Sequence, residues 1–153
     1  MISISHPTIS EVEIVTLSPE ETFNEGKNFA SRLNGGEVIA LVGELGAGKT
    51  VFTKGLCKGL DVKNPVISPT FTIANEYDAD FKIYHFDAYR LSGSEDAAAI
   101  GIEDYMMGDG VCIIEWADKV KEIIPEDAMW IYFQHDKDKE TGRILRIVSA
   151  GES

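Results

Sequence analysis

A continuous apolar run from Val38 to Val42 leads directly into a glycine-rich segment that ends in Lys49-Thr50. Such a run, bounded by turn residues, predicts a strand buried on both faces, which is typical of a parallel sheet. Parallel strands need long crossover connections, and the residues from Lys49 to about Leu60 have the composition of a helix. We therefore expect a strand, a loop and a helix in succession, within an α/β fold.

The segment between this strand and this helix reads Gly43-Glu44-Leu45-Gly46-Ala47-Gly48-Lys49-Thr50. The pattern Gly-x-x-x-x-Gly-Lys-Thr is a P-loop, or Walker A motif. Its glycines let successive backbone N–H groups point at phosphates, and the following helix offers its positive end to the anion. Lys49 can neutralise the β- and γ-phosphates, and the Thr50 hydroxyl can bind Mg2+. The motif predicts a nucleotide-binding segment from Glu44 to Thr50, whereas a plain glycine turn would not need Lys-Thr.

The other segments fit the same kind of fold. Further strands are expected near residues 11–17, 71–77, 82–86, 111–114, 129–134 and 144–149, and further helices near 18–33, 94–100, 102–107 and 117–123. Val12, Ile14 and Thr16 should share a strand face, and Ser18 and Glu21 fit a capping box. The chain of 153 residues is expected to form one domain over residues 1–153, a P-loop NTPase-like three-layer sandwich with a mixed, mainly parallel central sheet.

Two carboxylates stand at expected strand ends, Asp87 after Tyr84-His85-Phe86 and Glu115 after Ile114. Beside a P-loop, such carboxylates can bind Mg2+, often through water, or orient an attacking water. We predict Lys49, Asp87 and Glu115 as catalytic residues, and Thr50, Asp87 and Glu115 as Mg2+ ligands. Asp87 could instead cap the next turn, and Glu115 could instead be a glutamate favoured by a helix dipole.

Several other residues have both a functional and a purely structural interpretation. Ser68-Pro69-Thr70-Phe71 could be a switch-type loop in which Thr70 senses the γ-phosphate, or an ordinary proline turn. His85 shares the strand face of Asp87, but a lone histidine is more often a hydrogen-bonded structural residue. Arg90 could pair with Asp87, with phosphate or in a surface salt bridge. Trp116 could pack near the nucleotide or in the core.

The chain is strongly acidic, with a formal net charge of −12. It should therefore repel tRNA, DNA and anionic membranes at long range, so a partner would hold most of any nucleic acid. The lysines Lys54, Lys58 and Lys63 form either a solvated face or a docking surface for a partner or RNA. Cys57 and Cys112 form no CxxC motif and are expected to be buried free thiols. With no signal peptide or apolar span in the sequence, we expect a cytoplasmic protein.

Four segments, taken in order, resemble the TsaE (formerly YjeE) family, and the resemblance extends from Leu17 to about Gln134. They are Gly-Glu-Leu-Gly-Ala-Gly-Lys-Thr, Ser-Pro-Thr-Phe, His-Phe-Asp-Ala-Tyr-Arg-Leu and Ile-Glu-Trp. The resemblance implies a small P-loop fold with a mixed sheet, and an ATPase that supports threonylcarbamoyladenosine (t6A) modification of tRNA. It implies TsaD and TsaB as partners, with tRNA reached only through their complex and with no membrane contact.

The resemblance also implies roles for single residues. Glu44 to Thr50 would be the phosphate loop, Thr50 and Glu115 the Mg2+ ligands, and Asp87 the Walker B carboxylate. The stretch Thr16-Leu17-Ser18 would lie near the base, and Trp116 close to the nucleotide. Many members have a second threonine where this chain has Val51. The nucleotide-binding set is then Ser18, Glu44, Leu45, Gly46, Ala47, Gly48, Lys49, Thr50, Thr70 and Trp116.

Three other functions are compatible with a P-loop. A small-molecule kinase usually surrounds the transferred phosphoryl group with arginines, and here only Arg90, of four arginines, adjoins a motif in the sequence. A GTPase would carry an Asn/Thr-Lys-x-Asp segment to read guanine, which the sequence lacks. A binding module that uses ATP as a structural switch remains an alternative, because slow turnover is compatible with a site that a partner completes.

Overall fold

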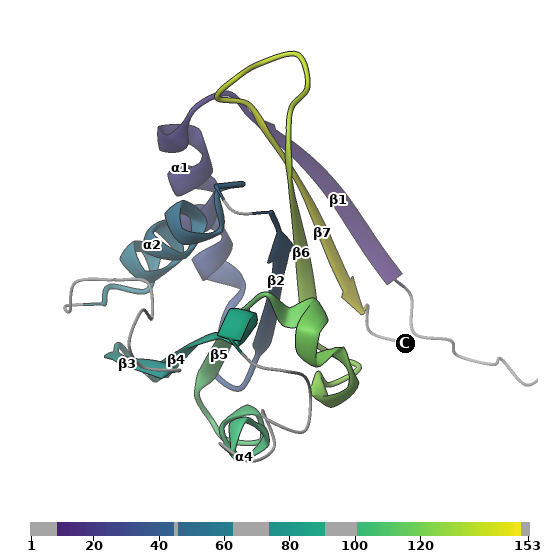
Figure 1. The fold of residues 1–153 in the computed structure, drawn as a ribbon. Helices are drawn as coiled ribbons and strands as arrows, with labels where there is room; N and C mark the ends of the chain where they lie inside the picture. The colour runs from purple at the N-terminus through teal and green to yellow at the C-terminus, as the bar shows by residue number, and fades with distance from the viewer. Residues whose placement is uncertain (1–8, 45, 63–73, 91–100, 151–153) are drawn as a thin grey trace, which may run out of the picture.

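The computed structural model describes residues 9–44, 46–62, 74–90 and 101–150. Within these ranges, seven strands form one sheet in the order β1-β7-β6-β2-β5-β4-β3 (Figure 1). The strands are β1 (Ile9–Thr16), β2 (Val38–Gly43), β3 (Ala74–Asp78), β4 (Lys82–Asp87), β5 (Val111–Glu115), β6 (Met129–His135) and β7 (Arg143–Ala150). The helices are α1 (Pro19–Phe29), η1 (Ala30–Arg32), α2 (Lys49–Gly59), η2 (Ala88–Arg90), α4 (Ile102–Met106) and η3 (Ala117–Ile123), where η marks a 3-10 helix.

The centre of the sheet is parallel and its two ends are antiparallel. Strands β6, β2, β5 and β4 run in the same direction, whereas β7 and β1 continue the sheet antiparallel beyond β6, and β3 pairs antiparallel with β4. Strands β3 and β4 form one antiparallel hairpin, and β6 and β7 form another. This arrangement confirms the mixed sheet with a parallel core that the apolar strands predict.

The sheet has a hydrophobic core on each face, which makes three layers. Helices α1 and α2 cover one face (Figure 1), where Phe52 and Leu56 pack with Ile39 and Ile113. The opposite face packs against α4 and η3 through a second cluster. Its strand residues, such as Ile114, alternate along the chain with those of the first cluster. Because neighbouring strand residues point to opposite faces, the central apolar runs supply both cores at once.

The ends of the elements depart from the sequence expectations in several places. Helix α1 ends at Phe29 and continues as 3-10, and residues 117–123 are 3-10 rather than α-helical. Ser18 caps α1 as expected, accepting from the Glu21 N–H, but the Glu21 carboxylate accepts from the Leu17 N–H rather than from that of Ser18. Val12 is 42% exposed, because β1 is an edge strand whose outer part lies beyond the helical layer. The expected helix at 94–100 and the start of the strand at 71–73 lie outside the described residues.

Both cysteines are buried free thiols, as expected, and burial raises the pKa of Cys57 and of Cys112 to about 12. Thiolates are the reactive form, so these groups are chemically inert at neutral pH. Among the residues that the structure describes, no helix has the length and apolar character needed to cross a membrane.

Helices α1 and α2 approach closely through glycines. A Cβ on Gly26 would overlap the backbone of Phe52, and one on Gly55 would overlap the backbone of Phe23. The two helix backbones can therefore come closer together than ordinary side chains permit. This contact holds α2, and with it the glycine-rich loop, against the rest of the domain.

Replacing Gly55 with alanine is expected to lower the free energy of unfolding by about 1–3 kcal/mol, the usual cost of overpacking. The new methyl group would collide with the Phe23 carbonyl, which outweighs the better helix propensity of alanine. Urea denaturation measures the change. Gly108→Ala is the matched control, because its Cβ would make only an ordinary 3.5 Å contact with the Tyr105 carbonyl. A Gly55→Ala protein as stable as wild type would contradict this account of the helix pair.

Candidate functional site

The glycine-rich loop connects the end of β2 to the start of α2, as the motif predicts. Gly46 and Gly48 have φ values of 79° and 105°, a conformation that glycine adopts without strain. Gly48 is the N-cap of α2 and contributes no side-chain hydrogen bond to the helix end. The N–H groups of the first turn therefore face the loop without a capping side chain, an arrangement that suits an anion.

Lys49, the first residue of α2, extends back across the loop. It is only 5% exposed, and its ammonium donates to the Gly43 carbonyl. The same Nζ lies 3.7 Å from the centroid of the Trp116 ring, a cation–π contact. Trp116 has φ 58° and packs against Tyr89, with ring centroids 4.9 Å apart. Trp116 therefore lies beside the lysine of the glycine-rich loop, and its position close to a nucleotide stays a prediction.

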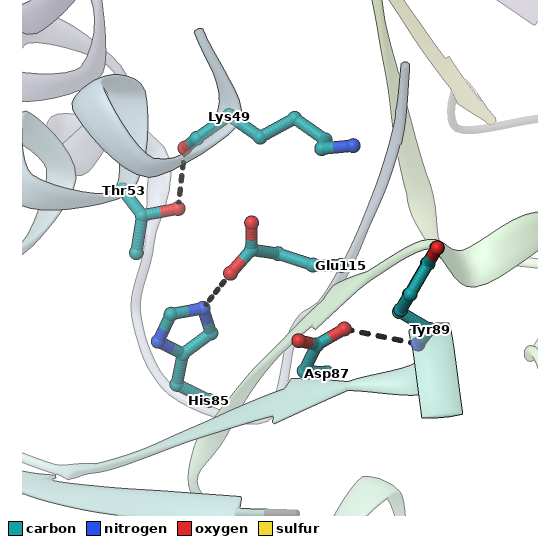
Figure 2. A network of polar contacts seen from close by, with 6 residues as sticks. All are labelled: Lys49, Thr53, His85, Asp87, Tyr89 and Glu115. Carbon is teal, nitrogen blue, oxygen red and sulfur yellow. Dashed lines mark hydrogen bonds and ion pairs between the residues drawn. The ribbon is translucent and has the colours of Figure 1, made fainter. Parts of the chain in front are cut away.

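The two predicted carboxylates lie side by side. Asp87 ends β4 and Glu115 ends β5, and the parallel register pairs these two residues directly. Both side chains therefore leave the sheet on the face that α1 and α2 cover. Figure 2 shows the side chain of Lys49, from α2, passing over Glu115 and Asp87, which come from the ends of β5 and β4.

The environments of these carboxylates differ. Asp87 is half-buried, and its Oδ1 accepts a 2.9 Å hydrogen bond from the Tyr89 N–H, so it does cap the next turn. Glu115 is 5% exposed, and its Oε2 lies 2.6 Å from His85 Nε2. His85 is fully buried and hydrogen-bonded, which is the structural interpretation that the sequence favours for a lone histidine. Both carboxylates nonetheless line the cavity described next.

A cavity of about 340 Å3 lies in front of the loop and the carboxylates. Val51 lines this cavity, and so do seven residues of the predicted site: Gly46, Gly48, Lys49, Thr50, Asp87, Glu115 and Trp116. Four further lining residues carry no prediction from the motifs: Pro19, Thr22, Thr141 and Arg143. The structure therefore brings together segments from all parts of the chain around one cavity.

The remaining predicted site residues are placed differently. Glu44 is exposed at the end of β2, Ala47 is buried in the core beneath the loop, and Ser18 caps α1 beside the lining residue Pro19. Of the stretch Thr16-Leu17-Ser18, Thr16 is buried and shares a 2.7 Å hydrogen bond with Thr22. Lys54 and Lys58 are exposed on α2. Four of the predicted positions lie outside the described residues: Leu45, Lys63, the segment from Ser68 to Phe71 that holds Thr70, and the side chain of Arg90.

The β6–β7 turn reaches the loop, which the sequence does not indicate. Arg143 donates to the Gly46 carbonyl at 3.1 Å and to the carbonyls of Glu140 and Gly142. Thr141 donates to the Leu17 carbonyl at 2.7 Å. Arg143 thus adjoins the P-loop in space although it adjoins no motif in the sequence, which corrects the count of arginines near the site. The pairing of β7 with β6 on one side and with β1 on the other brings these residues there.

The donor set of the cavity suits a hard cation. Thr50, Asp87 and Glu115 offer one hydroxyl and two carboxylates, the oxygen ligands that Mg2+ prefers together with phosphates and water. Over the described ranges, no group of three or more His, Cys, Asp and Glu side chains is arranged to hold a metal ion. A metal at this cavity would therefore depend on the phosphates of a ligand as well as on these side chains.

The charge of Lys49 is subject to two opposing effects. Burial lowers the pKa of Lys49, and the negative charges of Glu115, Asp118 and Asp87 act against this shift. Burial is the larger effect, because removing an ammonium from water costs more than these carboxylates return. The site therefore holds a cation that gains from any additional negative charge nearby.

The sheet, the strand–loop–helix segment and the cavity define a P-loop NTPase-like protein. A structure with the same fold is the crystal structure of Bacillus subtilis YdiB, which matches with a TM-score of 0.81 and 35% identity over 96% of this chain and 90% of that one. The family model described as threonylcarbamoyl adenosine biosynthesis protein TsaE matches residues 16–145.

Curated relatives agree with the family model. The tRNA threonylcarbamoyladenosine biosynthesis protein TsaE of Bacillus subtilis is 41% identical over 126 residues, covering 82% of this chain and 78% of the relative. The protein of the same name from Aquifex aeolicus is 40% identical over 137 residues, covering 88% and 96%. The chain belongs to the TsaE family, as the order of its motifs predicts.

Titration of the Lys49 ammonium, followed by NMR of the labelled lysine side chains, should give a pKa below that of lysine in a peptide. Burial disfavours the charged form, so the proton is lost at a lower pH. Glu115→Gln removes a negative charge that raises this pKa, and should therefore lower it further. An unchanged or higher Lys49 pKa in Glu115→Gln would contradict the electrostatics described here.

Proposed function

We propose that this protein is a Mg2+-dependent ATP hydrolase that supports t6A modification of tRNA together with TsaB and TsaD. The observation that carries the ATPase proposal is the convergence of Lys49 and Thr50, at the N-terminus of α2, with Asp87 and Glu115 around one cavity. A cation, a hydroxyl and two carboxylates around a glycine loop are the groups that phosphoryl transfer to water needs.

The loop from Glu44 to Thr50 would hold the triphosphate. Backbone N–H groups at the start of α2 would face the phosphates, and Lys49 would exchange the Gly43 carbonyl for phosphate oxygens. This exchange replaces a neutral acceptor with an anion, which favours a buried ammonium. Trp116 would lie close to the nucleotide in the cavity, and Ser18 with its neighbours would lie near the base. Leu45, Ala47 and Thr70 complete the proposed nucleotide-binding set.

Thr50, Asp87 and Glu115 would hold Mg2+, which neutralises charge that develops on the phosphate oxygens. The Glu115 carboxylate also faces the cavity from a buried position, where it can orient a water molecule towards the γ-phosphate and accept its proton. Asp87, whose Oδ1 accepts from the Tyr89 N–H, would supply the second carboxylate for the metal. Water is therefore the proposed acceptor of the phosphoryl group.

The arginine at the loop does not favour a small-molecule kinase. Arg143 donates to the carbonyls of Gly46, Glu140 and Gly142, so its hydrogen bonds in the structure tether backbone. Family membership supports the role in t6A biosynthesis. The net charge of −12 supports tRNA contact through TsaB and TsaD, since an acidic surface repels a polyanion.

Lys49→Ala and Glu115→Gln are both expected to lower ATP turnover by about 100-fold or more, the usual effect of removing a group that stabilises charge or moves a proton. Lys49→Ala should also weaken ATP binding, whereas Glu115→Gln should bind ATP nearly as well as wild type. Phosphate release and calorimetry measure these two quantities. Lys54→Ala, an exposed lysine on the same helix, is the control. Wild-type turnover in both site variants would show that the assigned roles are wrong.

Purified TsaB and TsaD should retain the protein in a pull-down, and their complex should raise its ATP turnover. A slow isolated enzyme is expected if the partners complete the site. The assay is run with and without ATP, and with Lys49→Ala in parallel. If the complex neither retains the protein nor raises its ATP turnover, the partnership is contradicted, while the ATPase proposal still stands. Transfer of phosphate to a small molecule faster than to water would contradict hydrolysis.

A further inference from the structure

His85 makes a contact that the proposed mechanism does not use. Its ring is fully buried on β4 and does not line the cavity, yet its Nε2 lies 2.6 Å from Glu115 Oε2. Figure 2 shows one oxygen of Glu115 directed at the imidazole and the other directed away from it, on the side of Lys49. The histidine therefore contacts a site carboxylate from within the core.

The register of the sheet explains this position. His85 pairs with Ile113 on β5, two residues before Glu115, and Asp87 pairs with Glu115 itself. His85, Asp87 and Glu115 share one face of the sheet, so the imidazole lies one pleat deeper than the two carboxylates. Its ring lies near Tyr77, with centroids 6.4 Å apart, on the opposite side from β5.

The other ring nitrogen has no such partner. Among the residues that the structure describes, His85 Nδ1 is buried without a hydrogen bond. An ionised carboxylate only accepts hydrogen bonds, so Nε2 is the donor to Glu115, and within the described part of the chain Nδ1 has no hydrogen-bond partner. A buried polar atom without a partner costs stability. An apolar side chain would fill this space without that cost, so packing alone does not explain a histidine here.

We propose that His85 is a positioning residue for Glu115. By donating to Oε2 it fixes the rotation of the carboxylate, so that the other oxygen keeps a constant direction on the side of Lys49. A fully buried ring that lies near Tyr77 can do this because burial restricts its own rotation. The inference rests on the proposed function, since it assigns His85 a task at the same site.

The test compares two amides that differ only in reach. Counted from Cβ, the amide nitrogen of glutamine is as many bonds away as His85 Nε2, whereas that of asparagine corresponds to Nδ1. His85→Gln should therefore keep the donor to Glu115, and His85→Asn should lose it. We expect His85→Asn to lower kcat by about 10–100-fold with little change in ATP affinity, and His85→Gln to stay close to wild type. Thermal unfolding checks that both variants are folded.

A double-mutant comparison separates positioning from a general structural effect. If His85 acts through Glu115, His85→Asn should lower kcat no further in a Glu115→Gln background. The inference is overturned if His85→Asn turns over ATP like wild type, or if it lowers kcat by the same factor with and without Glu115→Gln.

Failure of the proposed function gives a different pattern. If wild type shows no ATP turnover even with TsaB and TsaD, the ATPase proposal fails, and Mg2+ affinity in the presence of ADP, measured by calorimetry, decides on His85 alone. Weaker Mg2+ binding in His85→Asn than in wild type and His85→Gln would support positioning of Glu115. Equal Mg2+ binding in all three proteins would overturn it.

Discussion

The position of β5 between β2 and β4 sets the location of the two carboxylates beside the glycine-rich loop. Parallel pairing brings the carboxyl ends of the three strands to one edge, where Gly43, Asp87 and Glu115 end them. Strand β5 is buried on both faces, so a slip of one residue would turn its apolar side chains and Glu115 to the wrong faces. The register that builds the core therefore also fixes which carboxylates meet the glycine-rich loop.

The charges in the cavity depend on one another for their burial. Lys49 and Glu115 are each 5% exposed, and either group alone would be costly to remove from water. The attraction between the ammonium and the carboxylates, the Gly43 carbonyl and the indole of Trp116 offset part of that cost. The part of that cost that is not offset favours binding of a multiply charged ligand, because phosphate groups and a cation would complete the neutralisation.

Local patterns predict the strand–loop–helix and the meeting of Asp87 with Glu115, because the glycine spacing is contiguous and parallel strands share an edge. Arg143 and Thr141 could not be predicted in this way, since their approach to the loop depends on β7 lying between β1 and β6. Likewise, the 3-10 form of η3 follows a left-handed residue at Trp116, which no propensity indicates. Long-range strand order and strained backbone are decided by the whole fold.

The two carboxylates suit different tasks because they are held by different means. Asp87 is half-buried, and a backbone N–H fixes one of its oxygens, so solvent and a hydrated metal can reach it. Glu115 is shielded from water and gripped by a buried imidazole, which leaves one oxygen to face the cavity. A shielded, oriented carboxylate is the better acceptor for the proton of an attacking water, while an accessible one is the better metal ligand through water. In the proposed mechanism both carboxylates hold Mg2+, and their different environments would make Glu115 the one that also accepts the proton of the attacking water.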